Sequence, residues 1–280
     1  MAPDSLPPDL AAAIDAIAPR LPPLATSPLF FTTIGSTNDV AATLAGVPGA
    51  EGTVVIAETQ TAGRGRRGHS WFSPPGAGLY VSVVFRPRPA APGGALVEDR
   101  GMSLLTVMAG VAAVEAIADA TGVRPTLKWP NDLVVESPGA PARKLAGILA
   151  EGAMIGSRLS AVVVGLGVNL RPSAYPPEVA ARAIALETLA GRAVDPDGVL
   201  VALLGALARR RRALGEPDGC AALLDAWRAW SPSARGAHIR WRQQEQVCEG
   251  VTAGVDETGA LRVQTRTGEA RLVAGEVEWA

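Results

Sequence analysis

The sequence contains little cysteine and little histidine. Its 280 residues include two cysteines, Cys220 and Cys248, and two histidines, His69 and His238. Neither pair has the spacing of a zinc or redox motif, so we expect reduced thiols in a cytoplasmic protein. The nucleophile elbow Gly-x-Ser-x-Gly is also missing, and no nucleophile–base pair suggests a covalent enzyme intermediate.

A strong net charge, a secretory signal and a membrane-spanning run are missing as well. The formal net charge of −1 argues against a general binder of nucleic acid or of anionic membranes. The N-terminus has no positive region followed by an apolar one, so no secretory signal is expected. The most apolar helical stretch, 102–114, is too short to span a bilayer. With 48% hydrophobic residues, the chain is expected to bury a sizeable core.

The most informative feature present is a basic, glycine-rich loop. Residues 63–68 read Gly-Arg-Gly-Arg-Arg-Gly and follow the β-branched run 53–57, a predicted buried strand. Glycines let a ligand approach the main chain, and arginines bind carboxylate or phosphate groups. The same letters match a dinucleotide-binding pattern, but the prolines and glycines of 74–78 exclude the helix that must follow it. The loop, which we call the arginine loop, therefore favours a small anionic ligand, and a merely solvated loop stays an alternative.

The order of the predicted elements favours an α+β fold. Hairpins interleaved with helices predict a mixed, mostly antiparallel sheet rather than a doubly wound parallel one. A linker is predicted at 137–142, and short alternating strands begin near Arg235, on the scale of a small barrel. The domains are predicted to be an N-terminal extension (1–28), a large domain (29–233) and a small β domain (234–280). Strands are predicted at 29–32, 53–57, 79–85, 126–130, 133–135, 144–151 and 159–170, and helices at 10–18, 40–44, 101–120, 196–214 and 219–230.

Polar clusters occur in the loops beside these strands. They are Ser36-Thr37-Asn38, Gln60 with the arginine loop, Lys128-Trp129-Pro130-Asn131-Asp132, and Lys144. Cations suited to phosphate, together with a carboxylate suited to a hard divalent cation, are what adenylate-forming chemistry requires. Such an enzyme positions and polarises its substrates rather than binding them covalently.

Taken in order, the motifs resemble those of biotin protein ligases. The resemblance covers about 29–280, and its motifs are 36–38, 60–68 with 71–74, 128–133, 143–149 and 165–170. It implies a biotin- and ATP-binding catalytic domain over 29–233 and a small C-terminal SH3-like β-barrel. The implied reaction joins biotin and ATP, with Mg²⁺, into biotinyl-5′-AMP. The acyl group then passes to a lysine of a biotin carboxyl carrier protein domain of a biotin-dependent carboxylase.

The resemblance also implies a role for individual residues. Catalysis is assigned to Lys144, Asp132 and Arg66; Lys144 polarises the acyl-phosphate, and Asp132 serves the metal or the incoming lysine. Biotin binding is assigned to Ser36, Thr37, Asn38, Gln60, Gly63, Arg64, Gly65, Arg66, Lys144 and Gly147. ATP or adenylate binding is assigned to Arg64, Arg66, Trp71, Lys128, Asn131, Lys144 and Asn169, with Trp71 covering the adenine.

Simpler structural explanations stay open for several of these residues. Ser36 and Asn38 are typical helix N-caps, Trp71 can be buried under the loop, and Asn131-Asp132 can be only a turn. Trp129 is better explained by core packing. The run Arg209–Arg212 is better explained as cations at a helix C-terminus than as a nucleic-acid site.

Two rival functions remain. Some biotin ligases carry an N-terminal helix-turn-helix domain and act as repressors. Fewer than thirty residues precede the predicted catalytic region here, so we expect an enzyme without a DNA partner. A lipoate ligase on the same general fold is the other rival, but the motifs resemble the biotin branch. A homodimer is compatible with the sequence, which does not define the oligomeric state.

Overall fold

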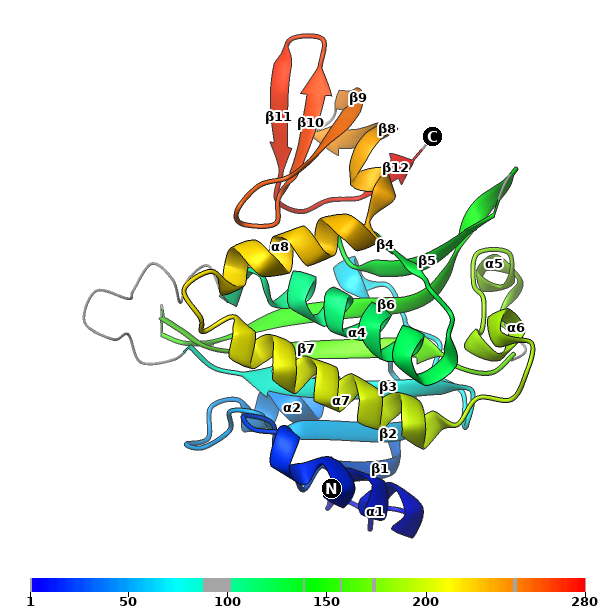
Figure 1. Ribbon diagram of the computed structural model, residues 1–280, viewed down its shortest axis with the longest axis vertical. Coiled ribbons are helices and arrows are strands. Elements are labelled where there is room, and N and C mark those ends of the chain that lie inside the picture. Colours follow the sequence, from blue (N-terminus) through cyan, green and yellow to red (C-terminus); the bar gives the residue numbers. More distant parts are fainter. Residues whose placement is uncertain are drawn as a thin grey trace.

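A computed structural model gives the fold of the chain and describes residues 2–87, 102–137, 139–156, 158–172, 175–243 and 246–279. Its main body is a sheet covered by helices, and a small β unit stands at one end of it (Figure 1). None of the helices in these ranges has the length and apolarity of a membrane span. The predicted α+β class is confirmed.

Within the described ranges, the large sheet has seven strands in the order β1-β2-β3-β7-β6-β5-β4. Strands β1 and β2 are parallel, and every other neighbouring pair is antiparallel. The prediction of a mixed, mostly antiparallel sheet is therefore confirmed. The strands are β1 Leu29–Ile34, β2 Val54–Gln60, β3 Gly78–Phe85, β4 Thr126–Lys128, β5 Asp132–Ser137, β6 Ala140–Ile155 and β7 Arg158–Asn169.

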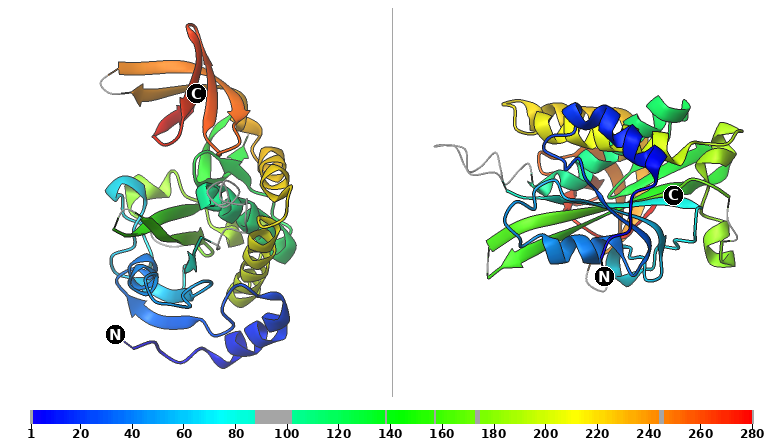
Figure 2. Two further views of the ribbon diagram at one scale, coloured as in Figure 1. Left: turned by 90° about the vertical axis from the view of Figure 1, so that its left-hand side faces the viewer. Right: turned by 90° about the horizontal axis from the view of Figure 1, so that it is seen from below.

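Helices cover both faces of this sheet (Figure 2). Side chains alternate along a strand, so Val54 and Ile56 of β2 join the main core while Val55 and Ala57 join a second core under α2. The helices are α1 Pro8–Ile17, α2 Thr37–Leu44, α4 Leu105–Thr121, α5 Pro177–Ala180, α6 Leu186–Ala190, α7 Pro196–Ala213 and α8 Gly219–Trp230, and the 3₁₀ turns are η1 Ala18–Arg20, η2 Arg66–Gly68 and η3 Pro232–Ala234.

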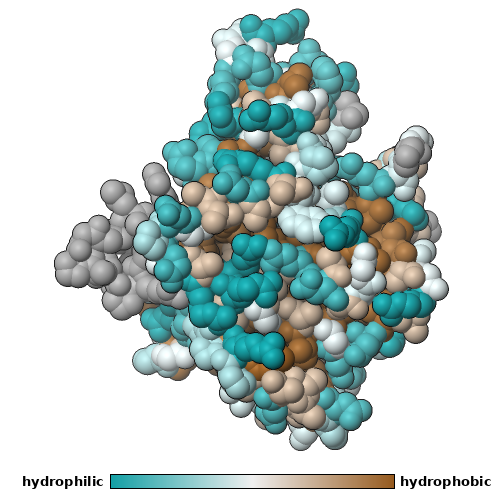
Figure 3. Space-filling model, viewed as in Figure 1, coloured by the Kyte–Doolittle hydropathy of each residue, from teal (hydrophilic) through white to brown (hydrophobic). Residues whose placement is uncertain are grey.

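The two long helices α4 and α7 lie side by side on the main-core face (Figure 1). The sequence explains their ends: Gly122 stops α4 in the left-handed conformation, and Asp195 caps α7 by accepting from the backbone N–H groups of Asp197 and Gly198. Figure 3 shows hydrophilic and apolar residues interspersed over the outer surface of this helical face.

The arginine run at the end of α7 is committed to contacts within the chain. Arg209 and Arg210 pair with Glu115 of α4, and Arg211 pairs with Glu51. Arg212 donates to two backbone carbonyls beside η1. These contacts tie α7 to its neighbours and favour the structural explanation of the run over a nucleic-acid site.

The first residues of the chain pack onto the large sheet. Leu10 and Ile14 of α1 are buried in the main core, and Asp4 accepts a hydrogen bond from the backbone N–H of Thr32 in β1. The division into 1–28, 29–233 and 234–280 stays a prediction.

The small β unit is, among the described residues, a five-stranded antiparallel sheet in the order β11-β10-β9-β8-β12. Trp129, which precedes β5, is 4% exposed and donates from its indole N–H to the Gly259 carbonyl at 3.1 Å. This contact joins the unit to the large sheet. The strands are β8 Arg235–Gln243, β9 Gln246–Val255, β10 Leu261–Thr265, β11 Gly268–Leu272 and β12 Val277–Trp279.

One local prediction is wrong, and one is correct in kind but not in position. The segment 137–142 is not a linker, because Ser137 of β5 pairs with Ala140 of β6. Gly139 has φ of 73° and closes the turn between them. The glycine- and proline-rich composition of 137–142 therefore indicates a hairpin. The turn predicted at Asn131-Asp132 is present but shifted: it lies at 129–131, and Asp132 begins β5, where it pairs with Lys128 of β4.

Candidate active site

A cavity of about 650 Å³ opens over strands β6 and β7, beneath the arginine loop. Its walls come from the start of α2, the arginine loop, the β4–β5 turn and the chain segment 275–279. All of the predicted site residues line this cavity except Gly63. Gly63 lies at the base of the loop, where a Cβ atom would stand 2.5 Å from the Trp71 carbonyl oxygen and clash with it.

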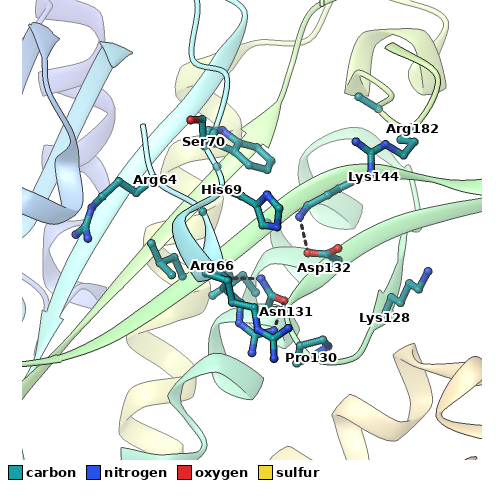
Figure 4. Close-up of a pocket in the computed structure, with 18 of the residues that line it drawn as sticks. Arg64, Arg66, His69, Ser70, Lys128, Pro130, Asn131, Asp132, Lys144 and Arg182 are labelled. Carbon is teal, nitrogen blue, oxygen red and sulfur yellow. Dashed lines mark hydrogen bonds and ion pairs between the residues drawn. The ribbon is translucent and has the colours of Figure 1, made fainter. Parts of the chain in front are cut away.

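One end of the cavity is cationic (Figure 4). Lys144 Nζ lies 2.6 Å from Asp132 Oδ1, and both side chains are about one-third exposed. The backbone of Lys144 is held from two sides: its N–H donates to the Arg182 carbonyl, and its carbonyl accepts from the Asn169 side chain at 3.2 Å. The lysine is thus fixed at the cavity with a carboxylate beside it.

Two further cations face the same end. Arg66 Nη1 donates to Asn131 Oδ1 at 3.1 Å, and the Asn131 amide donates to the Ile148 carbonyl. Burial and the neighbouring Arg67 lower the pKa of Arg66. Burial also lowers the pKa of Lys128, which stacks on the Trp279 ring. A bound anion would offset this cost of concentrating positive charge.

The opposite end of the cavity carries neutral hydrogen-bonding groups. Thr37 donates its backbone N–H to Gln60 Oε1 at 2.8 Å, and Gln60 Nε2 donates to Ser73 Oγ at 2.9 Å. Ser36 stands at the N-cap position of α2, but its side chain makes no capping hydrogen bond. Its hydroxyl is therefore not committed to the helix end.

The Trp71 ring lies close against two glycines of the cavity lining, Gly147 and Gly167. A Cβ atom at Gly167 would lie 2.4 Å from the Trp71 ring, and one at Gly147 would lie 2.9 Å from it. The ring also faces Lys144 Nζ at 5.4 Å. The Trp71 indole N–H is buried and has no acceptor among the residues that the structure describes.

Arg64 takes a different direction from Arg66. It points away from Lys144 and Asp132 (Figure 4) and forms ion pairs with Glu151 at 2.7 Å and Asp39 at 2.8 Å. In this conformation its guanidinium holds the start of the arginine loop against α2 and β6. The predicted contact of Arg64 with a carboxylate or phosphate would require that these pairs open.

Several cavity or near-cavity residues lie outside the motifs. Ser82 of β3 and Glu151 of β6 hydrogen-bond to motif residues. Glu276 lies 3.2 Å from His69, the residue that follows the arginine loop. Alternation along β6 could have flagged Glu151 as a partner of the loop, whereas nothing local in the sequence connects position 276 to position 69.

The residues around Asp132 suit a metal ion that arrives with its substrate. In the described ranges no group of three or more histidine, cysteine, aspartate or glutamate side chains could hold a metal ion. Mg²⁺ commonly binds through one or two carboxylates plus substrate phosphates and keeps several waters. Asp132, between Lys144 and the Arg66–Asn131 pair, would supply such a carboxylate, and the metal ion that it holds would help neutralise the phosphate charge.

Residues 31–169 match the model of the biotin/lipoate A/B protein ligase family. A biotin–[acetyl-CoA-carboxylase] ligase of Paracoccus denitrificans is 36% identical over 254 residues, which are 86% of this chain and 96% of the relative. The chain belongs to this family.

A second relative is longer than the matched region. The bifunctional ligase/repressor BirA of Bacillus subtilis (strain 168) is 29% identical over 252 residues, covering 89% of this chain and 73% of the relative. Among solved structures, the biotin protein ligase of Aquifex aeolicus in complex with biotin and ATP has a TM-score of 0.72 and 23% identity. It covers 91% of this chain and 98% of that chain, so the similarity of fold extends well beyond residues 31–169.

Proposed function

We propose that this family member is an ATP-dependent biotin–protein ligase. The observation that carries the proposal is that one cavity holds both a neutral hydrogen-bonding end, at Thr37 and Gln60, and a cationic end, at Lys144 and Arg66. A ureido ring suits the first end because it offers N–H donors and a carbonyl acceptor. A carboxylate and a triphosphate suit the second.

In the first step, a carboxylate oxygen of biotin attacks the α-phosphorus of ATP. A new oxygen–phosphorus bond forms, the bond to the β-phosphate oxygen breaks, and pyrophosphate leaves. Lys144 and Arg66 stabilise the negative charge that develops on the phosphoryl oxygens. Asn131 fixes the Arg66 guanidinium through the 3.1 Å hydrogen bond, so the donor is oriented before the substrate arrives.

In the second step, the amine of a lysine attacks the acyl carbon of biotinyl-5′-AMP, and AMP leaves. The amine loses a proton, and Asp132 is a carboxylate within the cavity that can accept it or hold a phosphate-bound Mg²⁺. The proposed acceptor is a lysine of a biotin carboxyl carrier protein domain. Covering the cavity with the arginine loop would keep water from the mixed anhydride.

Pyrophosphate release tests the adenylation step. The protein is incubated with ATP and MgCl₂ and with biotin or lipoate as the acid. We expect release with biotin and formation of biotinyl-5′-AMP. Release with lipoate equal to that with biotin would remove the assignment to biotin, and no release with either acid would remove the ligase proposal.

A further inference from the structure

An unbroken chain of hydrogen bonds and ion pairs connects Arg64, near the start of the arginine loop, with Trp71, which follows the loop. It begins at the Arg64 guanidinium and ends at the backbone carbonyl of Trp71. Neighbouring members are within hydrogen-bond distance of each other throughout. The intervening side chains, in order, are Glu151, Asn38, Ser82, Thr37, Gln60 and Ser73.

Glu151 is the only carboxylate in this series of hydrogen bonds, and it does not line the cavity. Its two oxygens accept from Arg64 Nη1 at 2.9 Å and from Arg64 Nη2 at 2.7 Å. The Oε2 atom also accepts from Asn38 Nδ2 at 2.7 Å. One glutamate thus connects the start of the loop with the first turn of α2.

The carboxylate determines which way the Asn38 amide faces. An ionised carboxylate only accepts hydrogen bonds, so the NH₂ group of Asn38 must point to Glu151 and its oxygen must point to Ser82. The same NH₂ group lies 3.5 Å from the Leu149 carbonyl, which is too long to fix the orientation alone. Asn38 is 4% exposed and Ser82 is fully buried, so their mutual hydrogen bond is shielded from bulk water.

The orientation of Asn38 in turn sets the donors and acceptors of the next two residues. Asn38 Oδ1 accepts the hydrogen of the Ser82 hydroxyl, whose oxygen lies 2.6 Å away. Because the single Ser82 hydrogen goes to Asn38, the 2.8 Å contact between Ser82 and Thr37 is a hydrogen bond only if the Thr37 hydroxyl donates to Ser82. Thr37 Oγ1 then keeps both lone pairs to accept an N–H donor from the cavity.

We propose that Glu151 is a positioning residue for the neutral end of the site. By orienting Asn38, it directs the Thr37 hydroxyl hydrogen to Ser82, so that both lone pairs of Thr37 Oγ1 stay available to a ureido-type N–H group. The inference rests on the proposed biotin site and adds a residue that never touches the ligand. It predicts that changes at Glu151 affect biotin binding and leave ATP binding in place.

The test uses the full chain and two substitutions of Glu151, with KM measured separately for biotin and for ATP in pyrophosphate release. Glu151→Ala removes the carboxylate that both Arg64 and Asn38 contact. We expect the biotin KM to rise about tenfold, since the buried Asn38 donor loses its acceptor. Glu151→Gln keeps one carbonyl acceptor and should raise the biotin KM by only about threefold. The ATP KM should stay within about twofold of wild type in both variants.

Two control substitutions separate this effect from charge alone. Glu58 is an exposed glutamate on β2, so Glu58→Gln removes a carboxylate of the same sheet without touching the hydrogen-bond chain. Asp39→Asn removes the other ion-pair partner of Arg64 but leaves the Asn38–Glu151 contact intact. Both variants should keep the wild-type biotin KM.

The outcomes distinguish this inference from the proposed function. No biotinyl-5′-AMP from the wild-type protein would overturn both. A wild-type enzyme that is active, with Glu151→Ala or Glu151→Gln at an unchanged biotin KM, would overturn only the role of Glu151. Biotin and ATP KM values that rise together would also overturn it, because a general loss of loop order would explain them. If Glu151→Ala does not fold, Glu151→Gln decides the question.

Discussion

Lys144→Ala is expected to abolish most adenylate formation while leaving the fold nearly unchanged. The Lys144–Asp132 pair is about one-third exposed on both sides, and pairs with this degree of exposure contribute only about 0–1 kcal/mol to the free energy of unfolding. The same ammonium group faces the cavity, where one oriented donor stabilises a transition state by about 2.7–4 kcal/mol. The expected result is a fall in kcat of about 100- to 1000-fold.

Arg143→Ala is the matched control for this variant. Arg143 is the preceding residue of β6, so its side chain leaves the opposite face of the sheet and is exposed outside the cavity. Pyrophosphate release is measured at saturating biotin and ATP, and the unfolding midpoint in urea is measured on the same samples. The reasoning would be refuted by a Lys144→Ala kcat within about fivefold of wild type, or by an equal loss in Arg143→Ala.

Three further predictions concern the metal, the loop and the cavity lining. EDTA should reduce pyrophosphate release to background and MgCl₂ should restore it; release that persists in EDTA would contradict a metal–phosphate complex beside Asp132. Arg66→Gly removes the hydrogen bond to Asn131 and should release biotinyl-5′-AMP, so that albumin added to the reaction becomes biotinylated; albumin labelled no more than with wild type would show that other residues retain the intermediate. Gly167→Ala places a methyl group 2.4 Å from the Trp71 ring and should lower the free energy of unfolding in urea by about 1–3 kcal/mol. At Gly46 an added Cβ atom would have no neighbouring atom within 4 Å, so Gly46→Ala should leave the free energy of unfolding unchanged. Equal stability of the two variants would contradict the packing of Trp71 on the sheet.

The sequence predicted the parts of the site that depend on local order. Glycine and arginine after a β-branched run placed the arginine loop at the end of β2, and the structure puts it there. The motif residues at 36–38, 128–132 and 144 come from separate loops and strands, yet they line one cavity. Their convergence was inferred from a family resemblance, since spacing along the chain does not show which strands become neighbours.

Contacts between distant segments could not be predicted from the sequence. Ser82 has the appearance of any small residue in a strand, and its place between Thr37 and Asn38 depends on β3 lying beneath α2. Glu276 reaches His69 because β12 returns to pair with β8 and brings the end of the chain to the cavity. The composition of 137–142 led to the wrong prediction of a linker, since a tight hairpin and a linker use the same residue types.

Transfer of biotin to a carrier lysine is the most direct test of the proposed function. The protein is mixed with biotin, ATP, MgCl₂ and a purified biotin carboxyl carrier protein domain, and the domain is analysed by intact-mass and peptide mass spectrometry. We expect one biotinyl group on one lysine of the domain, dependent on ATP and lost with Lys144→Ala. A domain that stays unmodified, while a known biotin ligase modifies it under the same conditions, would contradict the proposed function.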